Sequence, residues 1–144
     1  MLNKIIEIAK EAGQIVREGF GKNLDIEFKT NESNLVTQID KASEKKIIDY
    51  VKKEFPTHGI LAEESGESKN TSEYVWVIDP LDGTTNFAHG LPIFSVSIGV
   101  QKNGNTITGV VYDIMQDIVY SADSGGGAFA NNKRIKVSSN SKLQ

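Results

Sequence analysis

Apolar residues recur at intervals of three and four along the N-terminal part of the chain, which is the period of an amphipathic helix. One such stripe covers residues 2–20, and a second covers residues 39–55, where Pro56 follows and ends it. Between them, apolar and charged residues alternate strictly in "LDIEF" at 24–28, which predicts a half-buried strand. The pattern therefore predicts two N-terminal helices with a short strand between them.

From residue 74 onward the period changes from helical to two, which is the period of β-strands. The predicted strands are "YVWVI", "FSVSIGVQ", "TITGVVYD", "DIVYSA" and "RIKVS", with "KNGN", "SGGG" and "NNK" as hairpin-type connections. The polar tract "EESGESKNTSEY" before them predicts a surface loop. Helices followed by strands joined through short turns favour an α+β fold, with both helices packed on a mostly antiparallel sheet. The length of 144 residues fits a single domain.

Composition excludes several classes of protein. A formal net charge of -3 and a pI near 5.4 provide no general attraction to nucleic acid or to anionic lipid. With no cysteine the chain has neither disulfides nor a thiolate metal site. It contains no apolar run long enough to cross a bilayer, and its first residues alternate charge with apolar side chains, unlike a secretory leader. These features predict a cytoplasmic protein that binds neither membranes nor nucleic acid directly.

The stretch "VWVIDPLDGTTNF" concentrates oxygen ligands directly behind a predicted strand. Pro80 lacks an amide proton and has a fixed φ, so we expect it to end the strand and to hold its neighbours in a tight turn. Asp79, Asp82 and the carbonyl of Leu81 would then converge. Carboxylate and carbonyl oxygens are the ligands that Mg²⁺ prefers. A turn of this composition is also common with no metal, so this motif alone leaves both interpretations open.

Two further features favour the metal interpretation. Gly83 allows the backbone to approach an anion closely, and the residues from Thr84 onward are good openers of a helix whose free N–H groups attract phosphate. A second acidic pair, Glu63 and Glu64, also follows an apolar stretch and leads into a loop. Acids at the ends of two strands can meet at one edge of a sheet and carry enough charge for two metal ions.

Three segments, "GILAEES", "WVIDPLDGTTNFAHGLPIFSVSIGV" and "GGGAFANNKRIKVS", in this order and spacing, closely resemble the inositol monophosphatase family of magnesium-dependent, lithium-sensitive phosphatases. The resemblance runs from the first helix to residue 138. It implies the N-terminal half of a layered αβαβα sugar-phosphatase fold. The implied reaction is hydrolysis of myo-inositol monophosphate, a small phosphorylated polyol, by direct attack of metal-activated water. Related enzymes hydrolyse fructose bisphosphate or phosphorylated adenosine nucleotides, so the substrate stays open.

The resemblance also implies metal ligands among these residues. Glu63 would bind the first metal and help to order the attacking water, with Glu64 in support. Asp79 would bridge two metals, the Leu81 carbonyl would bind the first, and Asp82 would bind the second. Two or three Mg²⁺ ions occupy the complete family site.

The remaining implied roles concern substrate and catalysis. Gly83 and Thr84 would offer backbone amides to the phosphate, and the Thr84 hydroxyl would orient the attacking water. Asp40 matches a helix acid that hydrogen-bonds this threonine, which makes Asp40, Thr84 and Glu63 the implied catalytic set. The implied substrate-binding residues are Glu63, Leu81, Asp82, Gly83 and Thr84.

The chain departs from the family pattern in length. Family members are roughly twice as long, and their second half supplies another metal-binding aspartate in a W-D-x-A-A-G block that is absent from these 144 residues. The second metal site is therefore incomplete, and little or no activity is expected from this chain alone. We also expect an open side of the sheet that invites a homo-oligomer, such as a dimer, or a complementing C-terminal chain.

Two other classes of protein compete with this interpretation. Haloacid-dehalogenase-type phosphatases use a D-x-D-G-T motif with a nucleophilic aspartate, but "DPLDGT" has one residue too many between its acids. A non-catalytic metal-binding or regulatory module that acts through a protein partner is the second alternative. The histidines His58 and His89 lie outside the acid clusters and are predicted to be structural or on the surface.

Overall fold

The computed structural model describes residues 1–21, 37–67 and 72–140. Both predicted long helices are present: α1 spans Leu2–Gly19 and α2 spans Thr37–Glu54. A five-residue helix, α3, spans Thr84–Ala88. The strand predicted at 24–28 lies outside the described residues. No helix in the described part of the chain is long and apolar enough to cross a membrane.

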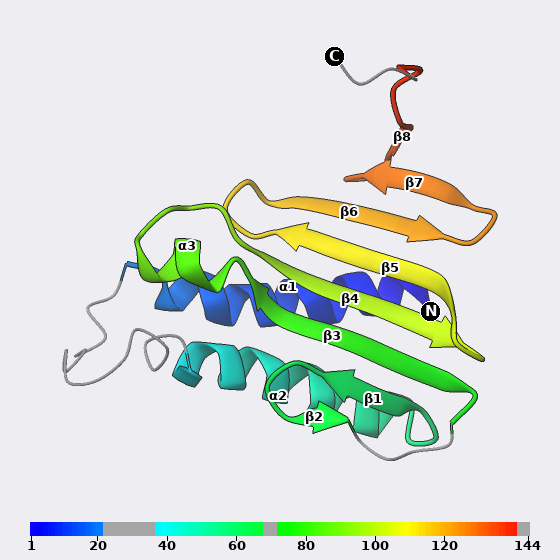
Figure 1. The fold of residues 1–144 in the computed structure, drawn as a ribbon, viewed down its shortest axis with the longest axis horizontal. Helices are drawn as coiled ribbons and strands as arrows, with labels where there is room; N and C mark the ends of the chain where they lie inside the picture. The colour runs from blue at the N-terminus through cyan, green and yellow to red at the C-terminus, as the bar shows by residue number, and fades with distance from the viewer. Residues whose placement is uncertain (22–36, 68–71, 141–144) are drawn as a thin grey trace.

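The strands form one sheet in the order β2-β1-β3-β4-β5-β6-β7-β8 (Figure 1). Only β1 and β3 pair in parallel, and every other neighbouring pair is antiparallel, which confirms the predicted α+β class with a mostly antiparallel sheet. The strand bounds are β1 Gly59–Ala62, β2 Gly66–Glu67, β3 Tyr74–Asp82, β4 Ser95–Lys102, β5 Asn105–Asp113, β6 Ile118–Asp123, β7 Gly127–Ala130 and β8 Lys133–Ile135.

Helices α1 and α2 lie side by side against one face of this sheet (Figure 1). Alternate residues of β3 and β4 point toward them: Trp76, Ile78, Val96, Ile98 and Val100 are buried, while the residues between them are more exposed. The core between helices and sheet includes Ile5, Ile8, Val16, Ile47, Val51, Trp76, Ile78, Val96, Ile98 and Val100. The helical and strand periods in the sequence therefore identify the two faces that meet.

The opposite face of the sheet is not covered in the described residues. Val111, Tyr120 and Ile135 are exposed there at 40%, 40% and 39%. Together with neighbouring residues of β4 to β8, they line a shallow depression of about 540 Å³. This exposed apolar surface agrees with the expectation that one side of the sheet is open.

The strands differ from the prediction in three places. Pro80 does not end β3, which continues to Asp82. The ladder with β4 shifts between the Asp79↔Ser97 and Asp82↔Ser95 pairs, so three steps on β3 match two on β4. This extra residue forms a β-bulge, which accommodates a proline because the bulged position needs no ladder N–H.

The other two differences are strands that the sequence patterns did not predict. β2 lies inside the tract predicted as a surface loop, where Gly66 and Glu67 pair with β1. β7 begins at Gly127, the last glycine of the predicted connection "SGGG", and pairs with β6. Both strands are short and lack a clear alternation of apolar and polar residues, so only pairing with a neighbour defines them.

Candidate metal centre

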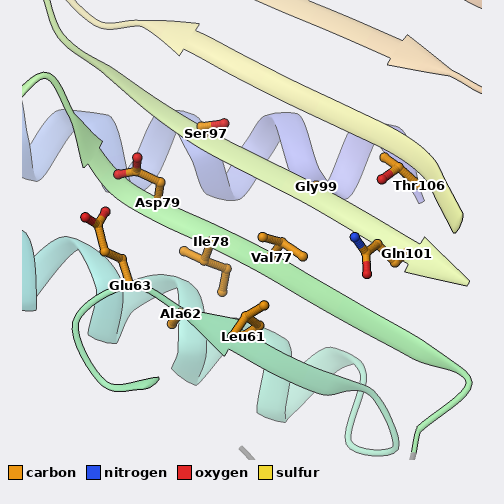
Figure 2. Close-up of a pocket in the computed structure, with 10 residues that line it drawn as sticks. All are labelled: Leu61, Ala62, Glu63, Val77, Ile78, Asp79, Ser97, Gly99, Gln101 and Thr106. Carbon is orange, nitrogen blue, oxygen red and sulfur yellow. The ribbon is translucent and has the colours of Figure 1, made fainter. Parts of the chain in front are cut away.

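The parallel pairing of β1 with β3 brings two of the predicted acids together. Ala62 pairs with Ile78, and the amide of Glu63 donates to the carbonyl of Ile78 at 3.2 Å. Glu63 and Asp79 are the next residues on the two strands, so they lie side by side. Figure 2 shows their carboxyl groups directed toward a common space at one end of a cavity of about 430 Å³. Glu63 and Asp79, one acid from each of the two predicted clusters, therefore meet where β1 and β3 end.

The bulge after Asp79 is closed by local hydrogen bonds. The amide of Leu81 donates to Asp79 Oδ1 at 3.1 Å, and the hydroxyl of Thr84 donates to the Leu81 carbonyl at 3.5 Å. Gly83 caps α3 with a φ of 92°, and a Cβ there would lie 2.9 Å from the carbonyl oxygen of Ile93. Only glycine fits both the left-handed backbone and this close approach.

Helix α2 supplies three polar side chains that are buried against this edge: Asp40, Ser43 and Glu44 are 5%, 0% and 3% exposed. The Ser43 hydroxyl donates to the Pro80 carbonyl at 3.1 Å, and Glu44 Oε2 accepts the amide of Glu64 at 2.8 Å. Asp40 Oδ1 is buried and has no hydrogen-bond partner among the residues that the structure describes. The predicted contact between Asp40 and the Thr84 hydroxyl is not among these bonds and stays a prediction.

Ser43 and Glu44 were not among the residues selected from the sequence. Their signal was nonetheless present, because positions 40, 43, 44, 47 and 51 follow the helical spacing of the apolar stripe of α2. Polar residues on a buried stripe are unusual and point to a specific partner. Nothing in the sequence identified the partners as the Pro80 carbonyl in β3 and the Glu64 amide after β1.

Burial and the charges of neighbouring acids raise the pKa values of Asp40 and Asp79. Burial, then the negative charge of Glu63 and a hydrogen bond with it, raise the pKa of Asp79 to about 6, with Asp82 contributing. Burial, followed by the charges of Glu64, Glu63 and Asp79, raises the pKa of Asp40 to about 7. The acids are thus close enough to destabilise one another when ionised, and a cation placed among them would relieve that repulsion.

The donor set fits a hard divalent cation. All candidate ligands are oxygens, namely the carboxylates of Glu63, Asp79 and Asp82 and the carbonyl of Leu81. Over residues 1–21, 37–67 and 72–140, no three His, Asp or Glu side chains by themselves already enclose a metal position. Glu63, Asp79 and Asp82 thus do not by themselves form such a position in these ranges, and their role as metal ligands stays a prediction.

The two histidines lie away from this edge of the sheet. Trp76 Nε1 donates to His58 Nδ1 at 3.0 Å, and the imidazole stacks between Phe55 and Tyr74 at ring distances of 4.9 and 4.8 Å. His89 is exposed at the C-terminal end of α3. The prediction of structural and surface roles agrees with both positions.

Comparison with known proteins identifies the family of this chain. The model of the inositol monophosphatase family matches residues 1–144. The chain belongs to that family. A Nus factor SuhB of Pasteurella multocida is 46% identical over 140 residues, which cover 95% of this chain and 52% of that protein. Inositol monophosphatase 3 of Solanum lycopersicum is 45% identical over 146 residues, which cover 99% of this chain and 54% of that protein.

Solved structures of this family share the fold. The native crystal structure of the extragenic suppressor protein suhB from Bartonella henselae superposes with a TM-score of 0.88 at 37% identity, covering 99% of this chain and 56% of that one. The fold is therefore that of the N-terminal half of an inositol monophosphatase. The chain spans about half the length of the curated relatives it matches.

Proposed function

We propose that residues 1–144 form one domain, the metal- and phosphate-binding half of a magnesium-dependent phosphate monoester hydrolase. The proposed substrate is a small phosphorylated polyol, with myo-inositol monophosphate as the leading candidate. The observation that carries the proposal is the convergence of Glu63 and Asp79 at the end of two paired strands, where burial and the charge of Glu63 raise the pKa of Asp79. Membership of the inositol monophosphatase family supports it.

The proposed ligands are Glu63, Asp79, Asp82 and the Leu81 carbonyl. When bound, Mg²⁺ supplies the positive charge that a phosphate dianion needs to approach these acids, and it activates water for attack. Without that charge, a carboxylate about 4 Å from the phosphate would repel each unit of its negative charge by roughly 4 kcal/mol at an effective dielectric near 20.

The backbone amides and the hydroxyl group that follow the bulge are proposed to bind the phosphate and to orient the attacking water. The amides of Gly83 and Thr84 bind the phosphate, and the left-handed conformation of Gly83 lets the backbone approach it. The Thr84 hydroxyl orients the attacking water once it leaves the Leu81 carbonyl and donates to Asp40. Asp40 suits this role because its buried Oδ1 accepts no hydrogen bond within the described part of the chain.

Phosphate release from inositol monophosphate, measured with Mg²⁺, tests the proposal. The chain is assayed alone and with a chain carrying the second half of a family member. Activity should depend on that second chain, stop in Asp79→Asn and fall with lithium, whereas the exposed control Asp49→Asn should retain it. Hydrolysis that persists in Asp79→Asn and in lithium would refute the metal assignment.

A non-catalytic module that acts through a protein partner is the second candidate. The name of one relative, Nus factor SuhB of Pasteurella multocida, which is 46% identical, favours it. The open face of the sheet offers an apolar surface for a homo-oligomer or a complementing C-terminal chain. A cytoplasmic location fits both candidates, because a chain without cysteine needs no oxidising compartment.

A further inference from the structure

Helix α2 is joined to both acid-bearing backbone segments through consecutive residues. Ser43 bonds the Pro80 carbonyl, and Glu44 bonds the Glu64 amide. Both side chains are buried, so each replaces water that a loop backbone would otherwise bind. Two segments that lie far apart in the sequence are thereby connected to a single turn of one helix.

The bond from Glu44 is unexpected on electrostatic grounds. Its carboxylate lies near other acids and raises the pKa of Asp40, so it adds repulsion to an edge that is already negative. Packing alone would be satisfied by an apolar side chain of similar volume. What only a polar side chain provides is an acceptor for the Glu64 amide, at 2.8 Å.

That acceptor determines where Glu63 lies. Glu63 is anchored on one side by its own amide, which donates to Ile78, and on the other by the amide of Glu64, which donates to Glu44. The side chain of Glu63 is exposed, so its position depends on its backbone. Loss of the bond to Glu44 would free the loop after β1.

The bond from Ser43 acts on the other segment. Pro80 has no N–H, so its carbonyl is its only backbone hydrogen-bonding group. The Ser43 hydroxyl donates to this carbonyl oxygen at 3.1 Å. Pro80 lies inside the bulge between Asp79 and Asp82. The hydrogen bond from the Ser43 hydroxyl therefore fixes the distance between the bulge and α2.

We propose that Ser43 and Glu44 are positioning residues that hold the Glu63 loop and the Asp79 bulge at the separation required for cation binding. The inference rests on the proposed function, because it assumes that these acids bind a divalent cation. Partners that orient metal ligands typically contribute 10- to 100-fold in metal affinity.

Mn²⁺, which is paramagnetic and can replace Mg²⁺, is the probe, and its Kd for the 144-residue chain is measured by electron paramagnetic resonance. Ser43→Ala and Glu44→Met remove the two bonds and should each weaken Mn²⁺ binding about 10-fold or more. Glu44→Gln retains an acceptor for the Glu64 amide and should stay within about threefold of the wild type. Asp49→Asn, on the exposed side of the same helix, is the matched control.

Amide hydrogen exchange supplies a readout that does not depend on metal. The Glu64 amide should exchange faster in Glu44→Met than in Glu44→Gln, without metal present. If Glu44→Met does not fold, Ser43→Ala and Glu44→Gln still carry the test.

The outcomes separate this inference from the proposed function. If the wild type binds no Mn²⁺, the cation site itself is wrong and both proposals fall. If the wild type binds Mn²⁺ and the folded Ser43→Ala and Glu44→Met chains bind it equally well, only the positioning role is wrong. Equal losses in Glu44→Gln and Glu44→Met would also overturn it, because the charge of Glu44 would then matter rather than its hydrogen bond.

Discussion

Replacement of His58 by phenylalanine should destabilise the chain, although the residue is remote from the acids. Trp76 is fully buried, and its Nε1–H can only donate, so His58 Nδ1 must act as the acceptor at 3.0 Å. Phenylalanine retains an aromatic ring between Phe55 and Tyr74 but removes the acceptor. A buried donor left without a partner costs about 1–3 kcal/mol, which is the loss expected at about pH 8 in His58→Phe.

The same contact makes this loss depend on pH. Burial lowers the pKa of His58 below its ordinary value of 6.5, so the unfolded chain binds the proton more readily than the folded one. The stabilisation from His58 is therefore complete above about pH 6.5 and decreases as the pH falls below that value. Protonation also turns Nδ1 into a donor that faces the Trp76 donor, so the difference between wild type and variant should shrink at about pH 5.5.

Charged groups near the stack limit how the experiment is designed. Lys4 lies over the Phe55 ring and pairs with Glu54, while Lys102 lies over the Tyr74 ring and pairs with Glu73. These groups are present in wild type and variant alike, as are the acids of the metal centre. A difference between the two proteins at each pH therefore isolates His58.

Urea unfolding followed by tryptophan fluorescence provides the assay, since Trp76 is the only tryptophan and reports directly on its own environment. His89→Phe, at the other and exposed histidine, is the control and should leave the free energy of unfolding within about 0.5 kcal/mol of wild type. The reasoning is refuted if His58→Phe costs less than about 0.5 kcal/mol at about pH 8, or if its cost is the same at both pH values.

Two further stability predictions follow from buried contacts. Burial and neighbouring acids raise the pKa of Asp40 from its ordinary value of 3.8 to about 7 in the folded chain. In EDTA, the free energy of unfolding should therefore fall as the pH rises between those two values, because the folded chain binds the proton more tightly than the unfolded chain. The pKa difference corresponds to at most about 4 kcal/mol, and solvent screening reduces this to about 1–2 kcal/mol. Urea unfolding at about pH 8 should therefore show Asp40→Asn to be about 1–2 kcal/mol more stable than the wild type. A gain equal to that of Asp49→Asn would contradict this prediction. Gly13→Ala should destabilise the chain by about 1–3 kcal/mol, although alanine has the better helix propensity. The reason is that the new Cβ would lie 2.6 Å from the Tyr112 ring. Thermal unfolding measures the effect, and an unchanged or higher Tm would show that the ring moves aside.

The sequence by itself determined the local structure and the chemistry of the candidate site. The three-and-four spacing over residues 2–20 and 39–55 identified both helices, because burial of one face requires that period. The alternation in β3 to β6 identified most of the sheet and its buried face. The acids and the glycine after them indicated a cation and phosphate site, since their chemistry is independent of how distant strands pair.

Only the tertiary structure decided which of these groups meet. The parallel pairing of β1 with β3 places Glu63 beside Asp79, and no local pattern encodes the partner or register of a strand pair. The bulge that carries Pro80 exists because β4 pairs on both sides of it, so proline did not end the strand. Burial of Asp40, Ser43 and Glu44 likewise depends on where α2 packs, because a helix face is defined by its sequence but its neighbours are set by long-range contacts.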